Sequence, residues 1–139
     1  MRNATHWRAQ ELKHHSADIV WLDAESARCA YDLVCLYDAK SHLGLNGNTV
    51  ASVERFERAD DVAGATRWLR ARVKGVQQFV VVLGADECFL CGSGFLLDNW
   101  SNIFIASRDD AMVYSKDTAF ILFYCHENQF EVGQRLVFD

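Results

Sequence analysis

The segment TAFILFYC, residues 118–125, is the most strand-like stretch of the chain. Aromatic and β-branched side chains dominate it, and such residues favour β-strands. Its apolar residues fall on both alternating faces, and VVVL at residues 80–83 shows the same pattern. An antiparallel sheet with one face in water would alternate apolar and polar residues. We therefore expect both faces of the sheet centre to be covered. Helices can cover one face, and the other requires sheet curvature around a cavity, a second copy of the protein or another partner.

Further strand-like segments occupy the chain from residue 76 onward. The expected strands cover residues 76–83, 88–97, 102–106, 111–114, 118–125 and 130–137. The second of these contains Gly92-Ser93-Gly94, which fits a bulge or a hairpin tip. Short strands at this spacing with polar turns between them predict an antiparallel meander of about five or six strands.

The first 75 residues show helical spacing instead. Asp23 is expected to cap a main helix whose apolar positions recur from Ala27 to Tyr37, with Gly44 after its end. Other helices are expected over residues 5–15, from Thr49 or Ser52 through Phe56, and from Asp60 or Asp61 to Gly75. Residues 18–22 fit either a strand or the start of the main helix.

These patterns predict a single α+β domain over residues 1–139. Its N-terminal helices are expected to pack on a C-terminal antiparallel meander sheet. An alternative architecture is a curved sheet that encloses a pocket around the main helix.

Composition narrows the class of protein. Half of the 139 residues are hydrophobic and 24% are charged, which is ordinary for a globular domain. No apolar run approaches the roughly 20 residues needed to span a bilayer, and the polar N-terminus does not resemble a signal peptide. The five cysteines are odd in number and lie among apolar neighbours. Reduced thiols, and hence a cytoplasmic location, are expected.

Charge is distributed unevenly along the chain. Up to Gly75 there are 11 Lys+Arg and 10 Asp+Glu, a net charge of +1. From Val76 onward there are 3 Lys+Arg and 9 Asp+Glu, a net charge of −6, so the two parts sum to the formal −5 of the chain. This balance argues against nucleic-acid binding, and it makes the sheet half a candidate surface for a basic protein.

Two motifs resemble a zinc site and a catalytic nucleophile, but each lacks residues or spacing that such a site needs. Cys88-Phe-Leu-Cys91 has the spacing of half a zinc site, yet the nearest further ligands by type are Cys125 and His126. Adjacent residues on a strand point to opposite faces, so Cys125 and His126 could not easily both ligate unless the strand had already ended, and we expect no metal site and no cofactor. The Gly92-Ser93-Gly94 segment lacks the spacing of a nucleophile elbow, and no helix is expected after it.

Acidic turns and nearby aromatic residues form the candidate binding surface. His126 beside Glu127 could also act as a general base, but neither a nucleophile nor a substrate-binding loop can be identified. The candidate binding residues are Asp98, Trp100, Asp109, Asp110, Tyr124, His126 and Glu127.

The sequence favours a non-enzymatic binding protein that forms a homodimer through its sheet. Recognition of a basic protein by the acidic half, as in an immunity protein or antitoxin, would fit its size and charge. The alternative is a small-molecule-binding protein or small enzyme with a pocket between helices and sheet. Its polar groups would be His126, Glu127, Tyr124 and Asp98.

Overall fold

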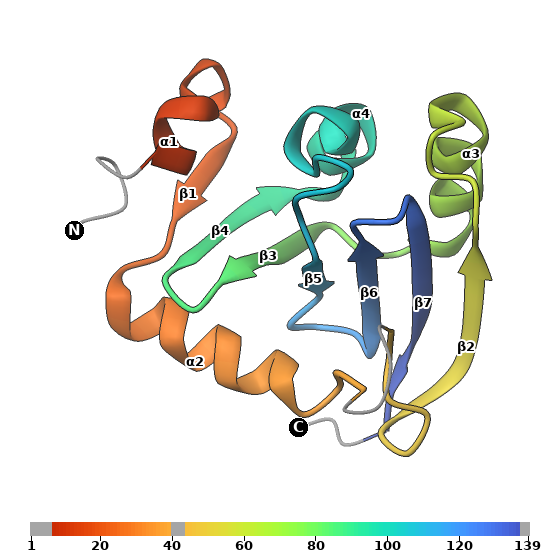
Figure 1. Ribbon diagram of the computed structural model, residues 1–139. Helices are drawn as coiled ribbons and strands as arrows, with labels where there is room; N and C mark the ends of the chain where they lie inside the picture. The colour runs from red at the N-terminus through yellow and green to blue at the C-terminus, as the bar shows by residue number, and fades with distance from the viewer. Residues whose placement is uncertain (1–6, 40–43, 137–139) are drawn as a thin grey trace.

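The computed structural model describes residues 7–39 and 44–136, and its strands form one seven-stranded sheet. The strands are β1 (Ile19–Trp21), β2 (Val50–Phe56), β3 (Gln78–Gly84), β4 (Glu87–Gly92), β5 (Ala111–Tyr114), β6 (Phe120–Cys125) and β7 (Gln129–Arg135). They are ordered β1-β4-β3-β5-β6-β7-β2, and every neighbouring pair is antiparallel (Figure 1). The C-terminal half of the chain therefore builds the sheet centre, and the N-terminal half supplies both edges.

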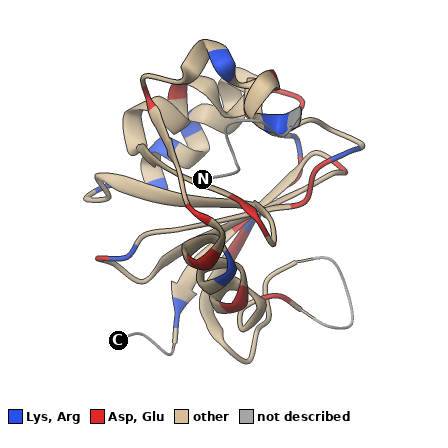
Figure 2. Ribbon diagram, turned by 90° about the vertical axis from the view of Figure 1, so that its left-hand side faces the viewer, with Lys and Arg blue, Asp and Glu red and all other residues tan. Residues whose placement is uncertain are grey.

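Helices lie on both faces of this sheet. They are α1 (Trp7–Glu11), α2 (Ala24–Cys35), α3 (Val62–Arg72) and α4 (Ser93–Ile103), with the short 3-10 helix η2 (Lys13–His15) after α1. Helix α2 lies below the sheet and the others lie above it (Figures 1 and 2). The α+β class with an antiparallel sheet is thus confirmed, but the helices are interleaved with the strands and not confined to the N-terminal half. Within the described residues, no helix has the length and apolar character needed to cross a membrane.

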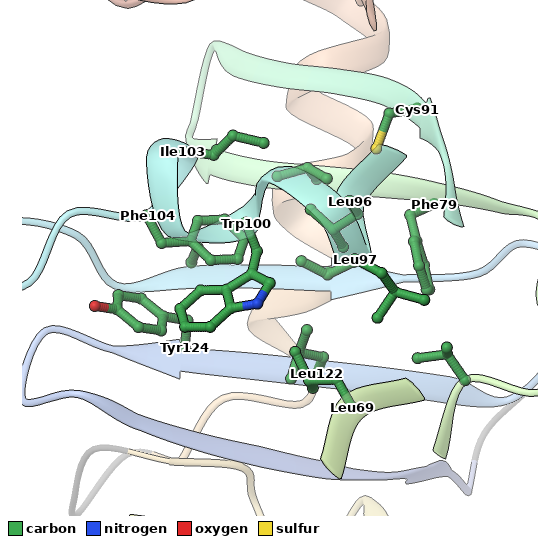
Figure 3. Close-up of a cluster of buried hydrophobic side chains, with 14 of the residues drawn as sticks. Leu69, Phe79, Cys91, Leu96, Leu97, Trp100, Ile103, Phe104, Leu122 and Tyr124 are labelled. Atoms are coloured by element: carbon green, nitrogen blue, oxygen red, sulfur yellow. The ribbon is translucent and has the colours of Figure 1, made fainter. Parts of the chain in front are cut away.

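Side chains from alternate positions of the central strands enter two separate cores. On one side, Ile121 and Phe123 of β6 pack with residues of α2 such as Val34. On the other side, Leu122 and Tyr124 pack with residues of α3 and α4 (Figure 3). The expectation that both faces are covered is confirmed. Because α2 of the same chain supplies the second cover, the apolar strands do not by themselves require a second copy, and the homodimer stays a prediction.

The expected helix from Thr49 or Ser52 through Phe56 is wrong, because these residues form the edge strand β2. The middle of β2 is exposed, so its sequence lacks the apolar pattern of a buried strand. Its register against β7 shifts between Ala51 and Glu54, where Ser52 adopts a positive φ of 59°. Its pairing partner, β7, is distant in sequence, so the residues of β2 and their neighbours could not indicate the pairing.

The expected strands over residues 88–97 and 102–106 are also wrong beyond Gly92. Strand β4 ends there and α4 begins at Ser93, so a helix does follow the Gly92-Ser93-Gly94 segment. Helix α4 buries Leu96, Trp100 and Ile103, which recur at helical spacing. The strand-to-helix junction still lacks the Gly-x-Ser-x-Gly spacing of a nucleophile elbow.

The remaining elements lie close to their expected positions. Residues 18–22, which fitted a strand or a helix, contain β1, and the expected helix over residues 5–15 is divided into α1 and η2. The Asp23 carboxylate caps α2 by accepting a hydrogen bond of 2.8 Å from the Ser26 N–H. Helix α2 ends at Cys35, well before Gly44, and residues 40–43 lie outside the described part of the chain.

Candidate functional site

A groove of about 790 Å³ runs along one flank of α2, where the helix approaches the ends of β5 and β7. Its helical wall is mainly apolar, with Cys29, Leu33 and Leu36 at positions i, i+4 and i+7. Helix residues at this spacing share one face. The volume falls within the range of roughly 300–1,000 Å³ that is usual for small-molecule sites. The groove is therefore the leading candidate for a binding site.

One end of the groove carries positive charge. The Arg135 guanidinium lies 5.4 Å from the ring centroid of Tyr114 and 5.9 Å from that of Tyr37. It also donates hydrogen bonds of 2.6 Å and 2.7 Å to the carbonyl oxygens of Ser115 and Thr118. These contacts fix the β5–β6 turn, which presents Lys116 to the groove. Lys116 is exposed and forms no ion pair with any residue that the structure describes.

Tyr114 supplies a hydrogen-bond donor at the same end. The residue is only 5% exposed, yet its hydroxyl group makes no hydrogen bond to a described residue. Burial raises the pKa of this phenol, the nearby Cys88 and Cys29 thiols add to the effect, and the Arg135 charge opposes it. The hydroxyl group is therefore protonated at neutral pH. It can donate to an acceptor placed in the groove.

The opposite end of the groove is acidic. Glu25 and Ser26 line it from the first turn of α2. About 10 residues of helix, or roughly 15 Å at 1.5 Å per residue, separate Glu25 from the end of α2 at Cys35, just before Tyr37 at the cationic end. The two ends of the groove therefore differ in charge. One end is acidic, the other is cationic, and an apolar wall lies between them.

Three of the predicted site residues gather away from the groove, at the turn between β6 and β7. The Nδ1 atom of His126 lies 2.8 Å from Oδ1 of Asp110, and the His126 backbone N–H donates to the same oxygen at 2.9 Å. The hydrogen bond to Asp110 raises the pKa of His126, and the charges of Asp110 and Glu127 act in the same direction. Glu127 follows in the turn and is exposed.

The other predicted site residues lie elsewhere, and none of the seven lines the groove. Trp100 and Tyr124 are buried in the core above the sheet (Figure 3). Asp98 is exposed on α4 and forms an ion pair with Arg70 of α3 at 3.7 Å. The groove residues that sequence reasoning missed are Tyr114, Lys116 and Arg135. The apolar spacing of Cys29, Leu33 and Leu36 was the one signal in the sequence that pointed to this flank.

Asp109 is held inside a buried network of charges. Arg108 donates to it through Nε at 3.0 Å and through Nη2 at 2.8 Å. Arg8 donates at 3.3 Å, and the Ile105 N–H donates at 2.9 Å. Burial alone would raise the pKa of Asp109, but the hydrogen bonds from Arg108 and Ile105 and the charges of both arginines outweigh it and lower the pKa.

The charge asymmetry along the sequence is partly compensated in space. Several acids of the sheet half pair with arginines of the first half, namely Glu87 and Asp109 with Arg8, Asp98 with Arg70, and Glu131 with Arg55. Figure 2 shows acidic and basic residues both above and below the sheet. Recognition of a basic protein therefore stays a prediction.

The CxxC cysteines do not form a pair. Cys88 enters the core below the sheet, where its thiol lies 3.6 Å from the carbonyl oxygen of Ala27, and Cys91 enters the core above it. Burial raises the pKa of each thiol to about 12, and the charges of Asp86 and Glu87 add to the effect at Cys88. These thiols are inert core residues at neutral pH.

Fold class alone does not determine function, so the function proposed below depends on the side chains of the α2 groove. No protein-family model matches the chain, and no curated protein matches it either.

Proposed function

We propose that this chain is a non-enzymatic binding protein whose α2 groove holds an amphipathic molecule with one anionic group. The observation that carries the proposal is the Tyr114 hydroxyl group, which belongs to a residue lining the groove, has no described hydrogen-bond partner and lies at the same groove end as Lys116. A carboxylate or similar anion in the groove would satisfy this donor and pair with the lysine.

The wall of the groove sets the shape of the ligand. Its apolar body would lie along Cys29, Leu33 and Leu36, a length of about 10 Å on a helix. Glu25 at the far end would repel a second anionic group. A single-chain carboxylate with an apolar tail therefore fits better than a dicarboxylate.

A binding role fits the groove better than catalysis. Cys29 is the nucleophilic thiol of the described lining, and it is exposed. No histidine belongs to that lining, so the described groove lacks the Cys–His pair that commonly activates a thiol nucleophile.

Fluorescence titration tests the proposal. The full chain is titrated with anilinonaphthalene sulfonate, an anionic amphipathic dye, which is then displaced with laurate or with lauryl alcohol. Laurate should displace the dye at lower concentration than the alcohol, because only laurate pairs with Lys116. Equal potency of the two competitors would contradict recognition of an anion.

Variants locate the binding site. Lys116→Glu should weaken laurate binding by about ten- to hundredfold, since a charge-assisted hydrogen bond contributes roughly 1.5–3 kcal/mol. Tyr114→Phe removes only the hydroxyl group and should weaken binding about two- to tenfold. Lys74→Glu is the matched control, because Lys74 is an exposed lysine that lies beyond α3 and outside the groove. Equal effects of the two lysine variants would refute the assignment.

A second pair of variants tests the apolar wall. Leu36 is 57% exposed, so Leu36→Asp should leave the fold intact while placing a charge in the groove. Val62 on α3 is 45% exposed, and Val62→Asp serves as its control. Only Leu36→Asp should reduce laurate affinity. An unchanged affinity in Leu36→Asp would show that the tail lies elsewhere.

A further inference from the structure

The ends of β5 and β6 bring together three side chains of different donor type. One atom from each of Asp110, Cys125 and His126 lies within 4.8 Å of the other two. The geometry points to a zinc site at this position, with three protein ligands and a fourth position left for water. This site is separate from the α2 groove and does not depend on the function proposed for that groove.

The antiparallel register places the first two ligands opposite each other. Ala111 of β5 pairs with Tyr124 of β6, so the preceding Asp110 lies opposite Cys125. Both side chains point to the α2 side of the sheet. Cys125 belongs to the core on that side, and Asp110 lines a small cavity there with Met112 and Phe123. A carboxylate and a thiol are thereby held side by side by the backbone of two paired strands.

The third ligand, His126, lies just after the end of β6, so the alternation of side chains along a strand does not apply to it. Adjacent residues within a strand point to opposite faces, and on this ground the sequence allowed Cys125 and His126 to ligate together only if the strand ended before His126. Strand β6 does end at Cys125, and His126 begins the turn. The Asn128 N–H donates to the Cys125 carbonyl oxygen at 3.0 Å, and Asn128 has a positive φ of 63°. This tight turn directs the imidazole ring of His126 back towards Asp110.

Backbone hydrogen bonds already orient two of the three donors. The His126 backbone N–H donates to Asp110 Oδ1 at 2.9 Å, and the 2.8 Å contact between His126 Nδ1 and the same oxygen would give way to the metal. The Glu127 N–H donates to the Cys125 sulfur at 3.4 Å. Two backbone N–H groups of the turn thus hold the carboxylate and the sulfur in place, which reduces the rearrangement needed to bind a metal.

The donor set selects zinc among common divalent metals. Calcium and magnesium prefer all-oxygen ligands, whereas zinc accepts sulfur, nitrogen and oxygen together. Tetrahedral bonds of about 2.0–2.3 Å separate the ligand atoms by about 3.3–3.6 Å. The required movement is small. The side chains of Asp110 and His126 are 41% and 37% exposed, so both can rotate around the fixed Cys125 sulfur.

Cobalt(II) provides the direct test, because it replaces zinc and reports its ligands by absorption. The full chain is titrated with Co²⁺ under reducing conditions. We expect saturable visible bands of a tetrahedral ion, together with a near-ultraviolet band from sulfur-to-cobalt charge transfer. Added Zn²⁺ should displace the cobalt and abolish both bands. Absence of the charge-transfer band in the wild-type chain would overturn the assignment.

Single substitutions identify the ligands. Asp110→Asn and His126→Ala change partly exposed side chains, so both variants should fold, and each should weaken Co²⁺ binding at least about tenfold. Cys125→Ser should remove the charge-transfer band. Cys29→Ser is the control, because Cys29 is an exposed thiol outside the cluster. Loss of the band in Cys29→Ser, or its survival unchanged in His126→Ala and Asp110→Asn, would overturn the proposal.

A thermal melt adds a readout that does not depend on spectroscopy of cobalt. Zn²⁺ should raise the melting temperature of the wild-type chain, because an ion that binds only the folded state stabilises it by mass action. The same Zn²⁺ concentration should leave Asp110→Asn and His126→Ala unshifted. An equal shift in these variants would place the bound zinc elsewhere.

Discussion

Substitution of Asp109 by Asn tests whether this buried carboxylate is a structural residue or an exposed recognition residue. Its side chain is 4% exposed and receives charge-assisted hydrogen bonds from Arg108 and Arg8. Breaking one side of a buried ion pair costs about 3–5 kcal/mol. The Arg108 side chain is 33% exposed and can be rehydrated, and Arg8 keeps its contact with Glu87 at 3.4 Å. We therefore expect Asp109→Asn to lower the free energy of unfolding by about 3 kcal/mol, the lower end of that range.

Urea denaturation followed by circular dichroism measures this loss. With a slope of about 2 kcal/mol/M for a domain of this size, the midpoint should fall by about 1.5 M. Asp117→Asn is the matched control, because Asp117 is an exposed turn residue whose substitution should change stability by less than about 0.5 kcal/mol. If Asp109→Asn were no more destabilising than Asp117→Asn, the ion pairs of Asp109 would not stabilise the fold.

Three further predictions concern close packing, thiols and alkaline stability. Gly133→Ala should destabilise the chain by about 1–3 kcal/mol, because its Cβ would lie 2.4 Å from Val50 Cγ1; Gly47→Ala has open space around it and should be neutral in the same denaturation assay. Ellman's reagent should label exposed Cys29 in the native chain but reach buried Cys88 and Cys91 only on unfolding, and equal rates for all thiols would contradict the two-core arrangement. The free energy of unfolding should fall as pH rises from the ordinary thiol pKa of 9.0 towards about 12, because the folded chain keeps the Cys88 and Cys91 protons that the unfolded chain loses. A Cys91→Ala variant should show a shallower alkaline decline, and an identical decline would contradict the raised pKa.

The central part of the fold could be predicted from sequence because its signal is local. The apolar runs in β3 and β6 indicated that both sheet faces are covered, and α2 and α3 were visible from their caps and apolar spacing. Strand β2 could not be found in the same way. Its exposed residues pair with β7, which is distant in sequence, and tertiary pairing overrides local propensity at such an edge.

Helix α4 shows a different kind of failure. Gly92-Ser93-Gly94 suggested a turn within a strand, but Gly92 instead ends β4 and caps a helix. The spacing of Leu96, Trp100 and Ile103 was helical and was outweighed by the strand pattern before it. The helical spacing was present in the sequence, but the apolar strand pattern of the preceding residues favoured a strand.

The candidate site was predicted less well than the fold. A groove depends on residues from distant parts of the chain, and Tyr114 and Arg135 become neighbours only through the pairing of β5, β6 and β7. Asp109 looked like an exposed turn acid, since no local pattern reveals Arg8 as its partner. The closeness of Asp110 and His126 likewise follows from the β5–β6 register and from the end of β6 at Cys125.

The most direct test of the α2 groove is amide chemical-shift mapping of the isotope-labelled chain during titration with laurate. We expect saturable shifts concentrated at Leu33, Leu36, Tyr114 and Lys116, with weaker binding in Lys116→Glu. Shifts that do not saturate, or that lie outside the groove and persist unchanged in Lys116→Glu, would contradict the proposed binding function.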